Sequence, residues 1–485
     1  MNWLRRAVGA VAGRVARWGG ASVKASYDAA ATTSENTKHW SKADDLSAAS
    51  ANSPEVRRIL RSRSRYERAN NGYIGGMVRR IAYHIVGPTG PRLGVTTGDE
   101  AADRQIEAAW LSWCRAVKLP RKLRCLAQAY IGDGEGIGLF VTDPDLAHSV
   151  KLELRLYEAD QMSTPGLALT RVDGVDGIEL NPAGKPTAYH FLRSHPGDAI
   201  GWVMDYDRVP ARSVVHWFRL DRPGQYRGVP HITPGLPLGA QLRRYTLAVL
   251  TAAETAANVA AYFETDNDAD ESETAAEEYS TMPIERGSIM QLPAKTKINQ
   301  LKAEQPTTTY QQFKSELLKE IGSATDTPFN VVACDSSPYN YSSARLDHLL
   351  FRAAVLCERA DCESEVLEPL FAAWLEEAVM VPGLLPPGTT PARVPHEWYW
   401  SGFPSIDPQK EAAADTERLN NGTTTLKELL AEYGQDWRTF LVQRGREIAL
   451  ADSLGVPYPT PGGAAQASAP AAPEQPAEEP QGATP

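Results

Sequence analysis

The segment from Asp335 to Ala378 constrains this chain most, because a turn-rich loop leads directly into the longest helical pattern in the sequence. From Ser342 to Ala378 a helix would be about 55 Å long at 1.5 Å per residue, more than an ordinary domain requires. Apolar and small residues recur along it at spacings of three and four, which predicts one face of an amphipathic helix. Ser364 is the only polar interruption among them: Leu346, Leu350, Ala353, Cys357, Ala360, Leu367, Phe371, Trp374 and Ala378.

Pro369 lies inside this pattern and predicts a kink, because proline lacks a backbone N–H and crowds the carbonyl four residues earlier. Two interpretations remain open. The segment is either a rod with a loop at its tip or a core helix of an ordinary α+β protein, and the periodicity alone favours the core helix.

The composition limits the classes of function. The 485 residues are enough for a sizeable core and predict two or three domains. We expect neither a membrane span nor a signal peptide, because arginines interrupt the apolar stretch at the N-terminus. The net charge of −10 argues against a tight grip on nucleic acid, since phosphate binding needs Lys and Arg, but it allows nucleic acid to slide past. Residues Arg5, Arg6, Arg14 and Arg17 indicate a frayed or partner-ordered terminus, with a lipid-touching amphipathic helix as the alternative.

The five cysteines form no CxxC pair. Cys357 and Cys362 are five residues apart, so on a helix they point about 140° away from each other. We therefore predict reduced thiols and no metal site.

The arginine-rich segment after Ser53 predicts two helices. Ser53 can cap the first, Pro54 fits its first turn, and Asn70 to Gly72 predicts a break before the second. Three interpretations of the arginines stay open, namely contact with phosphates, pairing with an acidic neighbouring subunit, and a solvated face. These residues are Arg57, Arg58, Arg61, Arg63, Arg65, Arg68, Arg79 and Arg80.

The middle of the chain changes period. Between Asp99 and Tyr130 one helical pattern places Ile106, Trp110, Trp113 and Val117 on one side, and from Ile131 the period becomes two. Residues 130–220 are therefore predicted as a β-rich unit of antiparallel strands. The glycines at 132, 134, 136 and 138 fit no phosphate-loop motif.

A Gly/Pro-rich connector at 221–235 precedes a second long helix, predicted from Leu238 to Phe263. The acidic run that follows has Asp266, Asp268, Asp270 and Glu277 at calcium-loop positions, but Glu271 replaces the required glycine, so we favour an exposed acidic loop. A helix from Thr309 to Ser323 comes next.

The C-terminal part predicts a small helical domain. Asp407-Pro408 reads as a helix start, and Thr425 with Glu428 as a capping box. From Pro457 onward the composition is that of a disordered tail.

No catalytic motif is present, so we predict no catalytic residue, no cofactor and no enzyme. The alternative is a soluble hydrolase with a pocket near 221–235 and His216 or His231 as base. A monomeric scaffold or adaptor is a third class.

The order of several segments resembles that of tailed-bacteriophage portal proteins of the lambda-like family. The resemblance spans about residues 50–450. Its pieces are RSRYERANNGYIGGMVRRIAYHIVGPTGPRL, DGEGIGLF, YEADQM, GIELNPAGKPTAYHF, VPARSVVHWFRLDRPGQYRGVPHITPGL, NYSSAR and IDPQKEAAADTERLNNGTTTLKELLAEYG.

The resemblance implies a portal-type subunit, with long helices around the central channel of a ring that is usually a dodecamer. The implied domains are a flexible arm (1–50), a wing (51–235), stem and clip (236–325), a tunnel loop (326–345), the long kinked helix with a return to the wing (346–404), a crown (405–453) and a disordered tail (454–485).

The resemblance also implies partners and a place in the virion. The partners are further copies of this chain, the large terminase subunit, major capsid and scaffold proteins, a head-tail connector protein and double-stranded DNA without sequence specificity, with no membrane. The expected locations are the portal vertex of the capsid and, during assembly, the host cytoplasm.

Two groups of residues are implied to face the DNA. The tunnel-loop group is Phe329, Asn330, Val331, Asp335, Ser336, Ser337, Tyr339, Asn340 and Tyr341. The group proposed for an acidic rim is Asp266, Asp268, Asp270 and Glu271.

Overall fold

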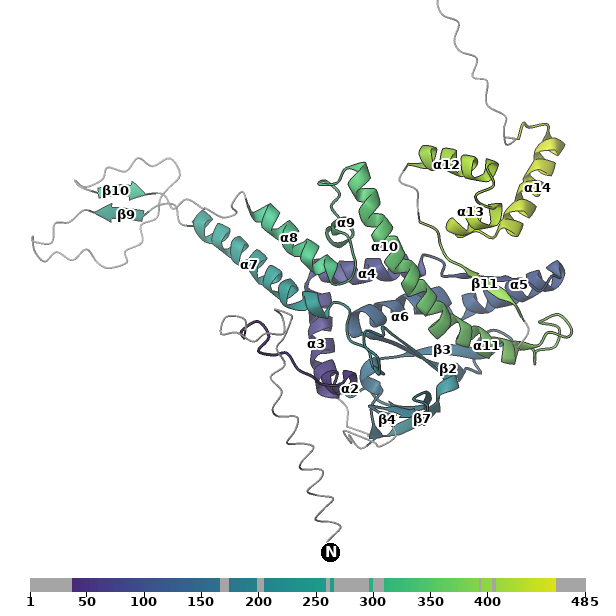
Figure 1. Cartoon of the computed structure of the whole chain (residues 1–485), viewed down its shortest axis with the longest axis horizontal. Helices are drawn as coiled ribbons and strands as arrows, with labels where there is room; N and C mark the ends of the chain where they lie inside the picture. The colour runs from purple at the N-terminus through teal and green to yellow at the C-terminus, as the bar shows by residue number, and fades with distance from the viewer. Residues whose placement is uncertain are drawn as a thin grey trace, which may run out of the picture.

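The computed structural model describes residues 37–165, 174–198, 205–258, 262–265, 296–299, 309–391, 394–403 and 407–458, and all structural statements below concern these residues. Within them the chain combines helices with antiparallel strands, which confirms the α+β fold class. In Figure 1 two helices project from a central body on one side, and a group of C-terminal helices lies above it.

The N-terminal helices begin where the sequence predicts. Ser53 caps α3 (Pro54–Asn70) by accepting from the amide of Val56, and Asn71 caps α4 (Gly72–Val86). The predicted break at Asn70 to Gly72 is therefore confirmed. A short helix, α2 (Ala48–Ala51), precedes them.

The helical pattern predicted between Asp99 and Tyr130 is confirmed and consists of two helices. Helix α5 (Glu100–Ala116) and helix α6 (Leu119–Asp133) are separated at Lys118, which has a positive φ of 56°. The prediction that a strand begins at Ile131 is wrong, because α6 continues to Asp133 and ends at Gly134. This glycine has a φ of 87°, the left-handed conformation that glycine adopts without strain at a helix end.

The predicted β-rich unit contains two antiparallel sheets, with strand orders β3-β2-β8 and β4-β5-β6-β7. The strands are β2 (Glu135–Thr142), β3 (Leu152–Tyr157), β4 (Gly174–Val175), β5 (Ile178–Leu180), β6 (Pro186–Leu192), β7 (Tyr206–Pro210) and β8 (Val214–Phe218). Three single-turn 3-10 helices, Ala159–Gln161, Ala211–Ser213 and Thr233–Gly235, adjoin them.

The β3-β2-β8 sheet separates two hydrophobic cores. Leu154 and Trp217 belong to the larger core, which the helices of the body share. Ile137 and Leu139 belong to a smaller core together with Phe191 from the other sheet. Alternate residues of a strand point to opposite faces, so one sheet can serve both cores.

The long helix predicted from Ser342 is present. It comprises α10 (Tyr341–Cys362), a π turn (Glu363–Leu367) and α11 (Glu368–Ala378), and it continues through Pro369. The irregularity thus precedes the proline. Pro369 has no N–H to donate to the carbonyl four residues earlier, and its ring would crowd that carbonyl in a regular α-helix. The wider π turn leaves room for the ring.

The projecting pair consists of α7 (Leu236–Asn258) and α8 (Tyr310–Ser323), as Figure 1 shows. The prediction that the first of these helices reaches Phe263 is wrong, because β9 (Tyr262–Thr265) pairs there with β10 (Thr296–Asn299). After α11 the chain returns to the body, where β11 (His396–Tyr399) pairs with β1 (Arg92–Val95).

The C-terminal helices confirm the predicted caps. Asp407 caps α12 (Pro408–Asn420), and Thr425 forms a capping box with Glu428 at the start of α13 (Leu426–Glu432). Helix α14 (Trp437–Leu454) completes this group. None of the described helices is both long and apolar enough to cross a membrane.

Candidate functional site

The loop at the start of the long helix contains a short helix of its own. Helix α9 (Phe329–Ala333) packs into the main core through Phe329, Val331 and Val332. Arg80 of α4 donates hydrogen bonds to the carbonyls of Val331 and Val332, at 2.5 and 2.8 Å. The expectation that Phe329 and Val331 face the DNA is therefore corrected, because both side chains are buried within the subunit. The signal for this in the sequence was the apolar run itself.

The exposed part of the loop is Cys334–Asn340, which we call the tip segment. The carboxylate of Asp335 accepts from the amide of Ser337 at 2.9 Å, and the amide of Tyr339 donates to the carbonyl of Ser336 at 3.1 Å. Ser336, Ser337 and Asn340 are exposed, whereas Asp335 and Tyr339 are half-buried. The exposed part of the predicted loop therefore consists of turns that follow the buried α9.

The residues at the two ends of the tip segment fix its position. Asn340 caps α10 through a reciprocal capping box with Ser343, so the motif NYSSAR is the start signal of this helix, with Tyr341 as its first residue. On α9, which precedes the tip segment, the side-chain amide of Asn330 lies 2.9 Å from the ring nitrogen of His348. The tip is therefore held at both sides by α10.

Helix α10 is in turn anchored in the body. The guanidinium of Arg359 donates to the carbonyls of His84 and Ile85 at the C-terminus of α4, and to that of Ser401. A cation at a helix C-terminus is favourable, because the unpaired carbonyls carry partial negative charge. In α11, Phe371 and Trp374 pack edge-to-face against Trp110 at ring distances of 5.3 Å. The long helix therefore joins the tip to the centre of the body.

The acidic candidates Asp266, Asp268, Asp270 and Glu271 lie outside the described residues. Their proposed position at a rim therefore stays a prediction.

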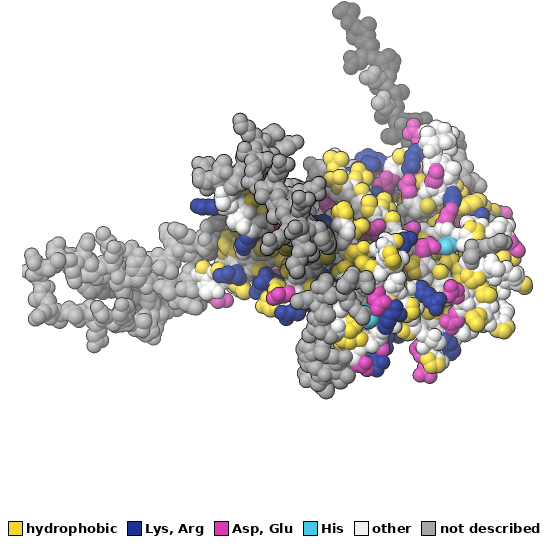
Figure 2. All heavy atoms as spheres, turned by 60° about the horizontal axis from the view of Figure 1, so that its bottom comes forward, with side chains coloured by type: hydrophobic (Ala, Val, Ile, Leu, Met, Phe, Trp, Pro, Cys, Tyr) yellow, Lys and Arg dark blue, Asp and Glu magenta, His cyan; other side chains and the backbone are white. Residues whose placement is uncertain are grey.

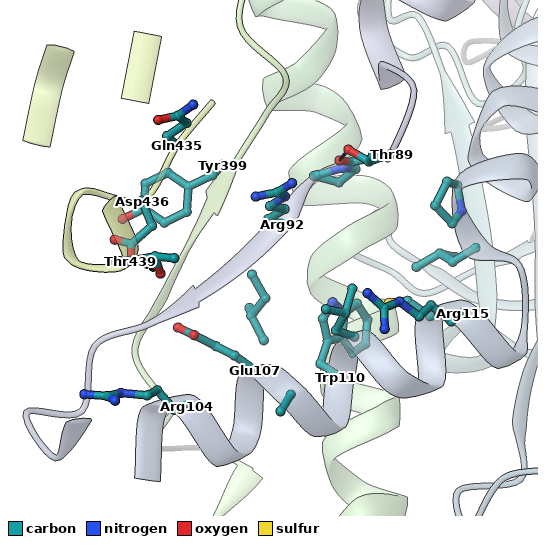
Figure 3. Close-up of a pocket in the computed structure, with 18 of the residues that line it drawn as sticks. Thr89, Arg92, Arg104, Glu107, Trp110, Arg115, Tyr399, Gln435, Asp436 and Thr439 are labelled. Atoms are coloured by element: carbon teal, nitrogen blue, oxygen red, sulfur yellow. Dashed lines mark hydrogen bonds between the residues drawn. The ribbon is translucent and has the colours of Figure 1, made fainter. Parts of the chain in front are cut away.

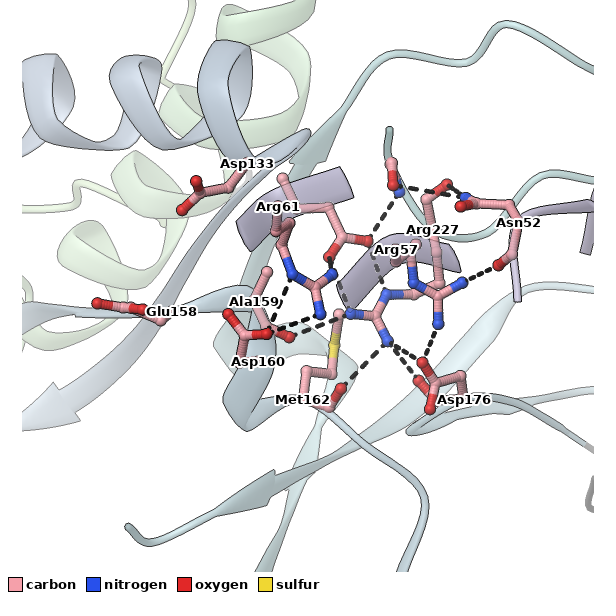
Figure 4. Close-up of polar contacts among 12 residues, drawn as sticks. Asn52, Arg57, Arg61, Asp133, Glu158, Ala159, Asp160, Met162, Asp176 and Arg227 are labelled. Carbon is pink, nitrogen blue, oxygen red and sulfur yellow. Dashed lines mark hydrogen bonds and ion pairs between the residues drawn. The ribbon is translucent and has the colours of Figure 1, made fainter. Parts of the chain in front are cut away.

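Four of the quoted sequence segments meet in one buried ionic cluster, shown in Figure 4. Glu135, from DGEGIGLF, accepts from Arg227, of RPGQYRGVP, at 2.6 and 2.8 Å. Arg227 also donates to Asp176 at 2.9 Å. On α3, Arg61 and Arg65 bind Asp160, of YEADQM, at 2.9 and 2.8 Å.

We define the ionic cluster as Arg57, Arg61, Arg65, Glu135, Asp160, Asp176 and Arg227. It decides the interpretation of Arg57 and Arg61, whereas the exposed residues Arg58, Arg63 and Arg79 keep all three interpretations open. Arg57, Arg61 and Arg227 are buried and bind carboxylates of the same chain, so these arginines face neither phosphate nor solvent. Burial alone would raise the pKa of Glu135, but the charge and hydrogen bonds of Arg227 hold it well below its usual range. The ionic cluster connects α3, both sheets and the Gly/Pro connector, so its role is to hold these elements together.

The two histidines of the hydrolase alternative are also buried. His216 lies 3.4 Å from Glu135, and burial lowers its pKa. His231 packs edge-on against Tyr130 at a ring distance of 4.4 Å, and burial lowers its pKa to about 3. A void of about 30 Å³ lies against His231, and it is too small for a substrate. The described residues around the connector therefore give the hydrolase alternative no support.

A cleft of about 850 Å³ lies between the body and the C-terminal helices (Figure 3). Its walls come from α5, the start of α6, β1, β11 and the first turns of α14. Trp110 and Leu111 provide apolar floor, while Arg92, Arg115 and Lys118 supply cations. Sequence reasoning missed this cleft, because its walls come from two distant parts of the chain and no motif marks them.

One group in the described part of the chain has the geometry of metal ligands. Glu158, Asp160 and His195 offer ligand atoms within 4.8 Å of one another. The guanidinium of Arg65, however, already lies 3.1 Å from Glu158 and 2.8 Å from Asp160. A cation of the protein thus occupies the place between the carboxylates, and the group does not fit a metal ion. The thiols Cys357 and Cys362 also share no site, because the first is exposed and the second buried.

The chain is similar in sequence to a known protein family and to several of its members. The chain matches the family model described as phage portal protein, lambda family, over residues 33–359. It is 26% identical to the probable portal protein of Halomonas phage phiHAP-1 over 426 residues, 82% of each chain. It is 22% identical to portal protein B of Escherichia phage lambda over 446 residues, 80% of this chain and 83% of that one.

Among solved structures, the chain is similar to a chain in the neck of an empty GTA particle. The identity is 16% and the TM-score is 0.45, over 82% of this chain and 93% of that one.

Proposed function

Because this chain belongs to the lambda family of phage portal proteins and therefore has a portal role, we propose that its copies form a ring around a central channel for double-stranded DNA. Twelve copies is the usual number for the family. The observation that carries the proposal is the family match, which extends from the N-terminal helices into the long helix. A ring at one capsid vertex would let DNA enter during packaging and leave during ejection.

The proposed partners follow from this role. The large terminase subunit docks on the ring and supplies ATP hydrolysis, while capsid and scaffold proteins and a head-tail connector protein bind its outer surfaces. This division of tasks agrees with a sequence that has no nucleotide-binding motif. The proposed locations are the virion and, during assembly, the host cytoplasm.

The tip segment is the part that we place against the DNA. Its exposed side chains carry no charge, and its one acidic group is the half-buried carboxylate of Asp335; the exposed residues are Cys334, Ser336, Ser337, Pro338 and Asn340. Such a surface makes no strong phosphate contact, so DNA can pass without being held. On the face shown in Figure 2, charges of both signs are interspersed with hydrophobic side chains and form no continuous basic field.

The acidic residues 266–271 are proposed to rim the same passage. Replacing Asp266, Asp268, Asp270 and Glu271 by their amides should change DNA translocation or retention, because repulsion of phosphates would be lost. Normal packaging and retention by this variant would exclude the rim.

Ring formation is tested by negative-stain imaging of the full chain. We expect rings with a central hole, and a population of compact monomers only would contradict the portal assignment of this chain.

The role of the tip is tested by deleting Ser336 and Ser337. We expect rings to form and DNA packaging or retention to fail, because the deletion spares the buried α9 and the cap at Asn340. Deletion of Pro387 and Gly388, two exposed residues of another turn, is the matched control and should leave packaging unchanged. Loss of ring assembly in the Ser336–Ser337 variant would instead make the tip a structural element.

A further inference from the structure

The apolar pattern of the long helix is exposed before the π turn and buried after it. Leu346 is 65% exposed and Leu350 is 74% exposed, whereas Phe371 and Trp374 are almost fully buried. The sequence predicts one face for all of them. Both interpretations of this helix therefore hold, each for one half: α11 is a core helix and α10 presents a bare apolar face.

The π turn explains the change. It adds about one residue to a helical turn, which rotates everything after it by roughly a quarter of a turn or somewhat more. The buried face of α10 is Phe351, Val355 and Cys362. The rotation brings Leu367, Phe371 and Trp374 toward that same side and leaves the preceding members of the pattern facing outward.

We call the outward residues of α10 the exposed stripe: Leu346, Leu350, Ala353, Cys357 and Ala360, flanked by Leu349 and Leu356. The first five repeat at alternating steps of four and three residues. A repeat of 3.5 residues is the spacing at which a helix packs along another helix. Several strongly exposed leucines next to one another on one helix are also typical of an interaction site.

We propose that the exposed stripe of α10 packs against the outward faces of α7 and α8 of the neighbouring copy in the ring. The proposal rests on the proposed function, since a closed ring needs two different, complementary faces on every copy. The occupant of the stripe is thus a second copy of this chain.

The outward faces of the projecting pair have a residue spacing that matches the exposed stripe. On α7 the exposed residues Leu247, Leu250 and Glu254 follow steps of three and four. On α8 Phe313, Glu316 and Glu320 do the same. Each face therefore presents an apolar part, Leu247 and Leu250 on α7 and Phe313 on α8, at a spacing that a facing helix can match.

The positions of these elements suit a contact between neighbours. Within one copy α9 packs against α8 and against α4, and Figure 1 shows α8 and α10 on either side of α9. The stripe and the faces of the projecting pair are therefore separate surfaces of one copy, as a head-to-tail contact requires.

The first test is a pair of variants with complementary defects. Leu350→Glu damages the stripe and Leu250→Glu damages the face of α7, and neither alters a buried side chain. We expect each variant alone to be monomeric at concentrations where the unaltered chain forms rings. Mixed together, they should form one-to-one dimers and no rings, because each dimer contains one intact contact. Leu454→Glu, at an equally exposed leucine of α14, should still form rings.

The second test uses thiols that the chain already has. Cys357 lies in the stripe and Cys125 lies on α6, and both are exposed in one copy. In assembled rings we expect maleimide labelling of Cys357 to slow at least tenfold relative to the monomeric Leu350→Glu variant, with Cys125 labelled equally in both.

Each failure has a distinct meaning. Rings formed by Leu350→Glu, or rapid labelling of Cys357 in rings, would overturn the stripe as the contact. Rings formed by Leu250→Glu, or no dimer in the mixture, would overturn the faces of α7 and α8 as its counterpart. If the unaltered chain forms no ring under any condition, the proposed function fails and not only this contact.

Discussion

The guanidinium of Arg227 and the carboxylate of Glu135 form a two-point pair at 2.6 and 2.8 Å, with both side chains almost completely removed from solvent. The backbone amide of Gly228 donates to the same carboxylate at 2.7 Å. The pair joins the connector before α7 to the first strand after α6. The projecting helices are thereby tied to the body at a point where every charge has a partner.

The two-point geometry predicts that Arg227→Lys is strongly destabilising. An ammonium cannot bind Glu135 at two points and Asp176 at the same time. A buried charge left without its partners costs on the order of 3 kcal/mol. We expect a loss of about that size in the free energy of unfolding, measured by urea denaturation.

Arg208→Lys is the matched control. Arg208 also binds a carboxylate, that of Glu179, but it is exposed, and exposed pairs contribute at most about 1 kcal/mol. Equal losses in the two variants would show that burial of the Arg227 pair has no energetic consequence.

Burial of His231 predicts acid sensitivity above pH 5. Its pKa is lowered to about 3 in the folded chain, whereas an unfolded histidine titrates near 6.5. Below about pH 6.5 the unfolded chain binds the additional proton, so stability decreases as pH falls, by up to about 1.4 kcal/mol per pH unit. The urea concentration at the midpoint of unfolding should therefore decrease as the pH is lowered from 7 to 5.

The variant His231→Phe keeps an aromatic ring against Tyr130 but cannot take up a proton. Its urea midpoint should depend less on pH in this range. A residual slope is expected from the other histidines whose pKa is lowered by burial, His84, His216 and His348. Identical slopes for both chains would exclude His231 as a source of the sensitivity.

Gly134→Ala should be destabilising by more than about 2 kcal/mol. The residue has a φ of 87°, and a Cβ there would lie 2.4 Å from the backbone of Val229, so backbone strain and a clash combine. Gly445→Ala in α14 is the opposite case, since its Cβ would meet nothing within 4 Å. We expect it to stabilise its helix by up to about 1 kcal/mol. Thermal unfolding of both variants checks the signs.

Asn340→Ala should loosen the start of α10 by about 1 kcal/mol, because the side chain accepts from the amide of Ser343 at 2.9 Å. Hydrogen exchange of the amides at 343–345 should quicken, while exchange in α11 should not change. Asn340→Asp, which keeps the acceptor, should exchange as the unaltered chain does. Faster exchange along the whole helix would show that the cap controls more than its own turn.

The sequence by itself determined the local features of this chain. Ser53, Asn340, Asp407 and Thr425 begin helices in the structure, since a cap depends on residues a few positions away. The quoted segments also indicated the family, which the match over residues 33–359 confirms.

The tertiary structure decided what the same segments do, because burial and pairing depend on residues that are distant along the chain. An arginine on α3 reads as a phosphate ligand until Asp160 and Glu135 are placed beside it. Phe329 reads as a loop residue until α9 is seen to pack into the core. The even spacing from Leu346 to Ala378 reads as one face, and only the π turn at Glu363–Leu367 divides it into an exposed half and a buried half. The sequence gives the spacing of the apolar residues along the chain. The local number of residues per helical turn decides the direction in which each of these side chains points.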